Sequence, residues 1–126
     1  MRAEDRRALG LAAFIGGAGV MHFVNPGFFD PIVPTWVPGR ARTTTYLSGA
    51  AELGSALLVA NPRTRRVGAW ACLLTFLGVY PANIQAVIDG GTPGQTGFAG
   101  SATAAWLRLP LQLPMFLWAR RVARES

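Results

Sequence analysis

The sequence has few residues that can form a disulfide, titrate near neutral pH or bind a soft metal ion. Its 126 residues include one cysteine, one histidine and no lysine, since all 12 basic residues are arginine. The single cysteine, Cys72, excludes an internal disulfide and a Cys-x-x-Cys redox motif. One histidine with the scattered Met21 and Met115 does not form a metal-ligand set, and there is no motif for flavin or haem. We therefore predict no metal site and no cofactor held by this chain alone.

Charge is missing from long parts of the chain. Residues 8–39, 43–62 and 67–107 contain one charged residue each, and most of the remaining charge lies in "MRAEDRR", "RTRR" and "ARRVARES". A soluble helical protein would distribute charge along one face of every helix. The net charge of +6 does not indicate a nucleic-acid-binding protein, because the arginines flank apolar segments and form no stripe. Attraction to anionic lipid headgroups is the favoured explanation.

Four apolar segments, residues 8–24, 45–60, 67–88 and 101–119, approach the length of about 20 residues that crosses a membrane core. We therefore predict one all-α domain over residues 1–126, a four-helix transmembrane bundle in the cytoplasmic membrane. The first segment could also be a signal peptide. Three further segments follow it, however, and "MHFVNP" offers no convincing cleavage site, so a retained helix is preferred.

The arginines predict the orientation of this bundle. With both termini in the cytoplasm, nine arginines lie inside and only Arg40 and Arg42 lie outside, which the positive-inside rule favours. The outer connection "NPGFFDPIVPTWVPGR" has too many prolines for a regular helix. Because it also has many aromatic and aliphatic residues, we expect it to lie folded over the outer mouth or at the membrane interface, as a lid. The second outer connection, "DGGTPGQTGFAG", is expected to be flexible.

Glu52 raises the question of function. It lies inside the apolar stretch "YLSGAAELGSALLV", with no Lys or Arg three or four residues away on the same helix. An ionised carboxyl in a membrane helix costs roughly 2.5–3.5 kcal/mol on insertion scales, so such a group is by default a functional hypothesis.

Counting residues along each helix places five polar side chains at similar depth in the outer half of the bundle. They are His22, Glu52, Asn83, Arg108 and Gln112. Arg108 and Gln112 are four residues apart and therefore share a helix face. We predict that Glu52 pairs with Arg108, directly or through Gln112, because an arginine fork can hold a carboxylate with two hydrogen bonds. These five are the predicted ligand-binding residues, and no catalytic residue is predicted.

A structural alternative fits the same residues. A Glu–Arg pair with two amides can hold four helices in register, and small residues such as Ser48 and Ser55 allow close helix contact. On this alternative the protein is a non-catalytic membrane scaffold whose outer loop docks a partner. A small-solute transporter is a third class, but inverted repeats and broken helices are its usual signs and a single four-helix chain is small.

The chain resembles the DoxX-like family of small four-helix membrane proteins over residues 9–119. The resemblance rests on "GGAGVMHFVNPGFFDPIVPTWVP", "YLSGAAELGSALLV", "FLGVYPANIQ" and "RLPLQLPMFLWA" in this order. It implies a four-helix bundle in the cytoplasmic membrane, and the family pattern falls on the same five polar residues. The family takes its name from a subunit of a thiosulfate:quinone oxidoreductase, and some relatives are associated with thiol and superoxide detoxification partners.

The resemblance and the polar cluster together suggest a redox-associated membrane subunit. An outer cavity would hold a quinone headgroup or a small sulfur or anionic compound, with Arg108 binding an anion or carbonyl and His22 or Glu52 handling a proton. Any reaction would make the chain an accessory subunit of a quinone- or thiol-linked oxidoreductase system. The expected partners are the lipid bilayer, a membrane or extracytoplasmic redox protein and, in a homo-oligomer, a second copy of the chain. No nucleic acid is expected.

Overall fold

The computed structural model describes all 126 residues, which form an all-helical chain. Four long helices make up most of it: α1 (Ala3–Val24), α3 (Ala41–Ala60), α4 (Arg65–Ile88) and α5 (Ala102–Glu125). Three short helical turns lie between them: α2 (Pro26–Phe29), η1 (Asp30–Ile32) and η2 (Phe98–Gly100). The all-α class predicted from the sequence is confirmed.

The predicted ends at residues 24, 60 and 88 agree with the structure. The first three long helices begin earlier than predicted, and α5 continues to Glu125. The prediction followed apolar residues only, whereas arginine and other polar residues extend a helix readily once its apolar part is packed. The outer connection was expected to contain no regular helix, but it forms α2 and η1. Proline is tolerated there because Pro26 is the first residue of α2 and Pro31 the second residue of η1, where no backbone N–H is needed within the turn.

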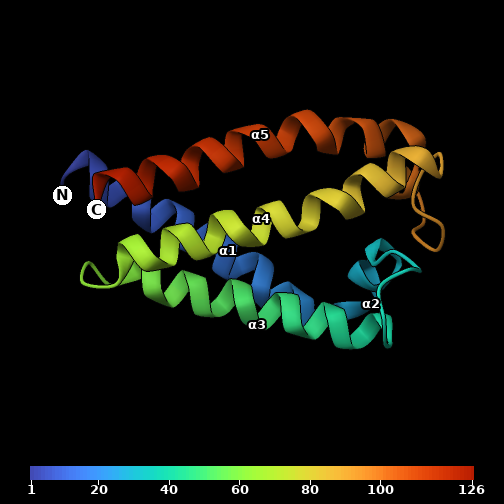
Figure 1. The fold of residues 1–126 in the computed structure, drawn as a ribbon, viewed down its shortest axis with the longest axis horizontal. Helices are drawn as coiled ribbons and strands as arrows, with labels where there is room; N and C mark the ends of the chain where they lie inside the picture. Colours follow the sequence, from blue (N-terminus) through green and yellow to red (C-terminus); the bar gives the residue numbers. More distant parts are fainter.

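The long helices run antiparallel to their neighbours in the chain (Figure 1). α3 packs against α1 and α4, and α5 packs against α4. Both termini lie at one end of the molecule together with the turn between α3 and α4, and we call this the terminal end. α2, η1 and the connection between α4 and α5 lie at the opposite end, which we call the loop end.

The apolar core lies toward the terminal end. Its buried members are Ala8, Leu11, Ile15, Ala56, Val59, Ala69, Cys72, Phe76, Ala119, Val122 and Ala123. Two ion pairs close this end of the molecule: Arg7 with Glu125 at 2.7 Å and Arg65 with Asp5 at 2.9 Å. This core therefore holds α1 and α5 together at the terminal end, and polar side chains take its place between the helices nearer the loop end.

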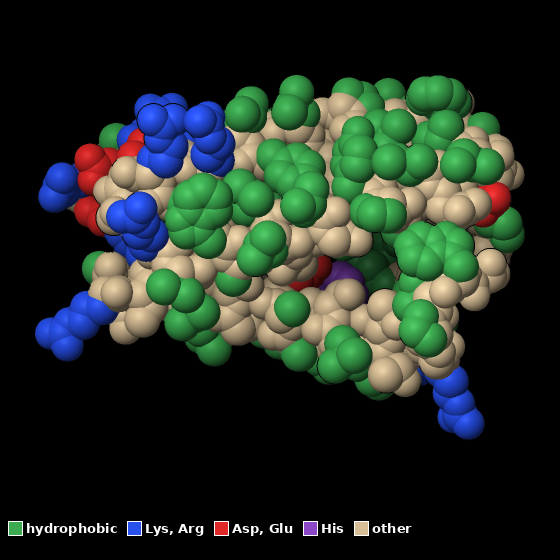
Figure 2. Space-filling view, viewed as in Figure 1, with side chains coloured by type: hydrophobic (Ala, Val, Ile, Leu, Met, Phe, Trp, Pro, Cys, Tyr) green, Lys and Arg blue, Asp and Glu red, His purple; other side chains and the backbone are tan.

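Large apolar side chains also cover the outside of the helices. Leu57, Leu74 and Leu111 are 74%, 64% and 63% exposed. Figure 2 shows apolar side chains along the length of the molecule and basic side chains mostly at the terminal end, with another projecting at the loop end. By length and composition alone, α1 and α4 are able to cross a membrane. An apolar surface of this extent is typical of contact with lipid or with another protein.

Gly49 allows α1 and α3 to approach each other closely. A Cβ atom at this position would lie 2.7 Å from the Cβ of His22 and 2.8 Å from the ring of Phe23. Carbon atoms prefer separations of about 3.5–4.0 Å, so α1 would have to move. Gly54 lies on the same helix, and a Cβ there would meet nothing within 4 Å.

We expect Gly49→Ala to destabilise the fold by about 1–3 kcal/mol through overpacking, in spite of the better helix propensity of alanine. Gly54→Ala gains the propensity without the clash, so we expect it to be neutral or to stabilise by up to about 1 kcal/mol. Thermal unfolding in detergent, followed by circular dichroism, compares the two variants. Equal unfolding temperatures would contradict the close contact of α1 with α3.

Candidate functional site

Glu52 is buried at the centre of the polar cluster, with 8% of its surface exposed. It faces His22 of α1, whose Nδ1 lies 3.5 Å from Glu52 Oε2. The same Nδ1 lies 2.6 Å from the carbonyl oxygen of Ala18. A carbonyl oxygen can only accept a hydrogen bond, so Nδ1 carries a hydrogen and donates a hydrogen bond to the Ala18 carbonyl. Glu52 Oε2 has no hydrogen-bond partner although it is buried, and such an atom calls for an explanation.

The segment after α1 fixes the histidine from the other side. Phe29 of α2 stacks on His22, with ring centroids 3.7 Å apart and planes 17° apart. The next residue, Asp30, accepts hydrogen bonds from Thr45 at 2.7 Å and Arg42 at 2.8 Å. Burial alone would raise the pKa of Asp30, but these two hydrogen bonds outweigh it and hold the pKa below its usual value. Asp30 therefore fastens α2 and η1 to the start of α3 at neutral pH.

A cavity of about 270 Å³ opens in front of Glu52 and His22, between α3 and α4 and below the outer connection. We call it the window cavity. Residues of the outer connection, among them Ile32, Val33 and Trp36, line it, so the structure places this connection over the cavity as the sequence predicted. Figure 2 shows the hollow, with the only histidine side chain of the chain at its floor.

A second cavity of about 220 Å³ lies between α1 and α5, and we call it the α1–α5 cavity. Its walls include the apolar side chains Phe14, Leu111 and Met115. The two cavities share Ala18, Glu52, Val79 and Asn83 as lining residues. Glu52 thus lies between the window cavity and the α1–α5 cavity.

The predicted pair of Glu52 and Arg108 is not formed. Arg108 donates to the hydroxyl of Thr92 at 3.1 Å, to the side-chain oxygen of Gln95 at 2.9 Å and to the carbonyl of Ala99 at 2.8 Å. A guanidinium has five donors in a planar fork, and the connection before α5 supplies three oxygen atoms to them. These three hydrogen bonds hold the connection between α4 and α5, which was expected to be flexible, to Arg108 of α5.

Gln112 does not link Glu52 to Arg108 either. It accepts a hydrogen bond from Asn83 at 2.7 Å and donates to the carbonyl of Phe76 at 2.6 Å. Both amide side chains are buried. These bonds join α4 to α5, which is the kind of contact that the structural alternative expected.

The structure brings the five predicted residues around the two adjoining cavities. His22, Glu52 and Asn83 line the window cavity, and Glu52, Asn83, Arg108 and Gln112 line the α1–α5 cavity. Sequence reasoning missed Phe29 as the partner of the histidine ring. The only signal for it was an aromatic residue in a connection expected to cover the mouth.

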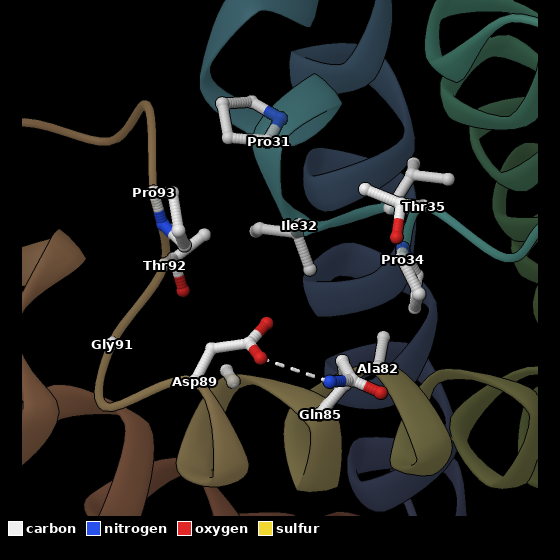
Figure 3. Close-up of a pocket in the computed structure, with 12 residues that line it drawn as sticks. Pro31, Ile32, Pro34, Thr35, Ala82, Gln85, Asp89, Gly91, Thr92 and Pro93 are labelled. Carbon is white, nitrogen blue, oxygen red and sulfur yellow. Dashed lines mark hydrogen bonds between the residues drawn. The ribbon is translucent and has the colours of Figure 1, made fainter.

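A smaller cavity of about 120 Å³ lies between the outer connection and the end of α4 (Figure 3). Gln85 and Asp89 point into it from α4, opposite Ile32 and Pro34. Gln85 donates to Asp89 at 3.0 Å and accepts from the indole of Trp36 at 3.2 Å. The side chains of Gln85 and Asp89 in this cavity therefore have hydrogen-bond partners within the protein. The bond from Trp36 to Gln85 holds the outer connection to α4.

No three side chains of the metal-binding types come together in the structure. A family model matches residues 11–123, a range that contains both cavities and all five predicted residues. The chain belongs to the family described as domain of unknown function DUF8561. Neither a curated protein nor a solved structure matches it.

The hydrogen bonds of Asn83 and Gln112 can be tested by their effect on stability. We expect Gln112→Leu to lower the free energy of unfolding by about 1–3 kcal/mol, because it leaves the Asn83 amide and the Phe76 carbonyl unpaired in the interior. Asn83→Leu should cost a similar amount. Gln85→Leu, whose polar partners are exposed, serves as the control and should cost less.

The double variant Asn83→Leu/Gln112→Leu removes both amides at once. We expect it to be more stable than the sum of the single losses predicts, with a coupling of about 0.5–3 kcal/mol. Strict additivity would show that the two side chains do not bind each other. Denaturant titration of the four proteins in the same detergent measures the coupling.

Proposed function

We propose that the protein is a redox-associated subunit of the cytoplasmic membrane whose buried Glu52 binds a small ligand. The observation that carries the proposal is that Glu52 lines both cavities while its buried Oε2 atom has no hydrogen-bond partner. Leaving a buried acceptor unpaired costs about 1–3 kcal/mol, more for a charged group. A ligand with a matching group removes that cost, so the site favours occupancy.

In this proposal all four long helices cross the membrane, with both termini in the cytoplasm. The exposed leucines on the outside of the helices support it, as does the gathering of arginines at the terminal end (Figure 2). The less apolar helices α3 and α5 carry Glu52, Arg108 and Gln112, whereas His22 and Asn83 lie on α1 and α4. Polar groups inside a membrane protein face the bundle interior or a cavity, and the cluster around Glu52 does so.

The chemistry of the site suits a quinone headgroup or a small sulfur compound, as the resemblance to the DoxX-like family implies. Apolar walls at Phe29, Val33 and Val79 would contact a ring, and Glu52 and His22 would exchange a proton with it. Arg108 has a smaller role than the sequence suggested, because three neutral oxygens already occupy its donors. We place the electron carrier on a membrane or extracytoplasmic partner protein.

Native mass spectrometry of the protein, extracted with its own lipids, tests the proposal. We compare wild type with Glu52→Gln and with Glu4→Gln. The second variant makes the same change at a side chain that is 43% exposed and far from the cavities in the sequence. We expect a small molecule retained by wild type and by Glu4→Gln, and lost from Glu52→Gln at equal thermal stability.

An empty wild-type protein, or one small molecule bound equally by all three proteins, would contradict the proposal. Either result would favour the non-catalytic scaffold, in which the polar cluster sets the helix register and the outer connection docks a partner protein.

A further inference from the structure

The Glu52 carboxyl, which lines the window cavity and whose Oε2 has no hydrogen-bond partner, restricts the chemistry of a ligand there. The nearest nitrogen, His22 Nδ1, donates to Ala18, and the Asn83 amide donates to Gln112. His22 Nδ1 therefore has no hydrogen left for Glu52, and the second hydrogen of the Asn83 amide forms no hydrogen bond with Glu52 Oε2. A hydroxyl group both donates and accepts, so it can pair with the carboxyl whether or not the carboxyl carries a proton. An ether oxygen can only accept a hydrogen bond and a hydrocarbon can form none, so neither can pair with the carboxyl in both of its protonation states.

The window cavity has no fixed positive charge. Among its lining residues only His22 and Glu52 can be titrated, and no arginine contributes to it. Arg108 reaches only the neighbouring α1–α5 cavity, and its hydrogen bonds hold it to the connection before α5. An anion in the window cavity would meet a carboxyl group and no cation, so its desolvation would not be compensated. This favours an uncharged ligand.

The window cavity opens on the side of the molecule, between two long helices (Figure 2). Its edges are small side chains. Thr44 and Ser48 precede Glu52 at intervals of four residues on α3, and Gly78 and Ala82 have the same spacing on α4. Residues four apart share one face of a helix, so both helices present small residues to the opening. A Cβ at Gly78 would meet nothing within 4 Å, which shows that space remains there.

We infer that the ligand of Glu52 is an uncharged, lipid-soluble molecule with a hydroxyl group, which reaches the carboxyl from the bilayer through the window between α3 and α4. The inference rests on the proposed function, because it takes the helices to span the membrane. The volume of about 270 Å³ falls just below the usual range of small-molecule sites, about 300–1,000 Å³. A single ring with its hydroxyl would fit, and an alkyl tail would extend through the window into the lipid.

Three probes and one spectroscopic signal test this inference on the full chain in phosphatidylcholine vesicles. The probes are 4-decylphenol, its methyl ether 4-decylanisole, and thiosulfate. The signal is the ¹⁵N resonance of His22 Nδ1, the imidazole nitrogen beside Glu52, and it comes from one residue because the chain has one histidine. A saturable shift of this resonance separates binding at the site from simple partitioning into lipid.

We expect the phenol to bind at least about tenfold more tightly than the ether, since the ether leaves Glu52 without a donor, and we expect no saturable shift with thiosulfate. Gly78→Leu should block the window and weaken binding of the phenol at least about tenfold. Gly54→Leu adds the same side chain at an exposed position of α3 outside both cavities and should bind as wild type does. Ala82→Leu replaces Gly78→Leu if that variant does not fold.

Equal affinity for phenol and ether, a saturable shift with thiosulfate, or equal losses in Gly54→Leu and Gly78→Leu would each overturn the inference. Native mass spectrometry keeps the two proposals separate. A native ligand that depends on Glu52, with no binding of the phenol, would leave the proposed function standing and refute the inference. No native ligand and no bound probe would refute both.

Discussion

The burial of one carboxyl group without a cation partner determines how the loop end of this molecule is built. Glu52 lies where α1, α3 and α4 meet, and its nearest charged or titratable neighbour is a histidine already bound to a backbone carbonyl. Burying a carboxyl costs free energy unless it is hydrogen-bonded or paired with a cation. The helices around Glu52 supply no such partner to Oε2 and leave room on both sides of the residue for a ligand.

That space depends on contacts at both ends of the helices. At the terminal end, Leu11 and Val122 belong to a core that draws α1 and α5 together. At the loop end, Asp30 fastens the outer connection to α3, and Arg108 holds the connection before α5. The two cavities therefore lie between helices that are held at both ends. A ligand site on such a frame can be preorganised without any charge pair at its centre.

The sequence predicted the height of each polar group better than its direction. Helical rise is constant at 1.5 Å per residue, so residue counting brought His22, Glu52 and Asn83 to one level correctly. The partner of Arg108 could not be predicted in the same way. Several acceptors lay within reach of a long side chain, and the oxygens that bind it belong to residues 92–99, a glycine-rich stretch with no readable pattern. The stacking of Phe29 on His22 likewise depends on how two connections fold in space.

The most direct test of this account measures which nitrogen lies next to the Glu52 carboxyl in a lipid bilayer. In a Glu4→Gln/Glu125→Gln background Glu52 is the only glutamate, so its ¹³C-labelled carboxyl gives a single solid-state NMR signal. Dipolar coupling to ¹⁵N-labelled histidine and to ¹⁵N-labelled arginine is measured in separate samples. The account predicts clear coupling to His22 and none to arginine. Strong coupling to arginine would place Arg108 against Glu52, satisfy the carboxyl within the protein, and contradict the claim that Glu52 awaits a ligand.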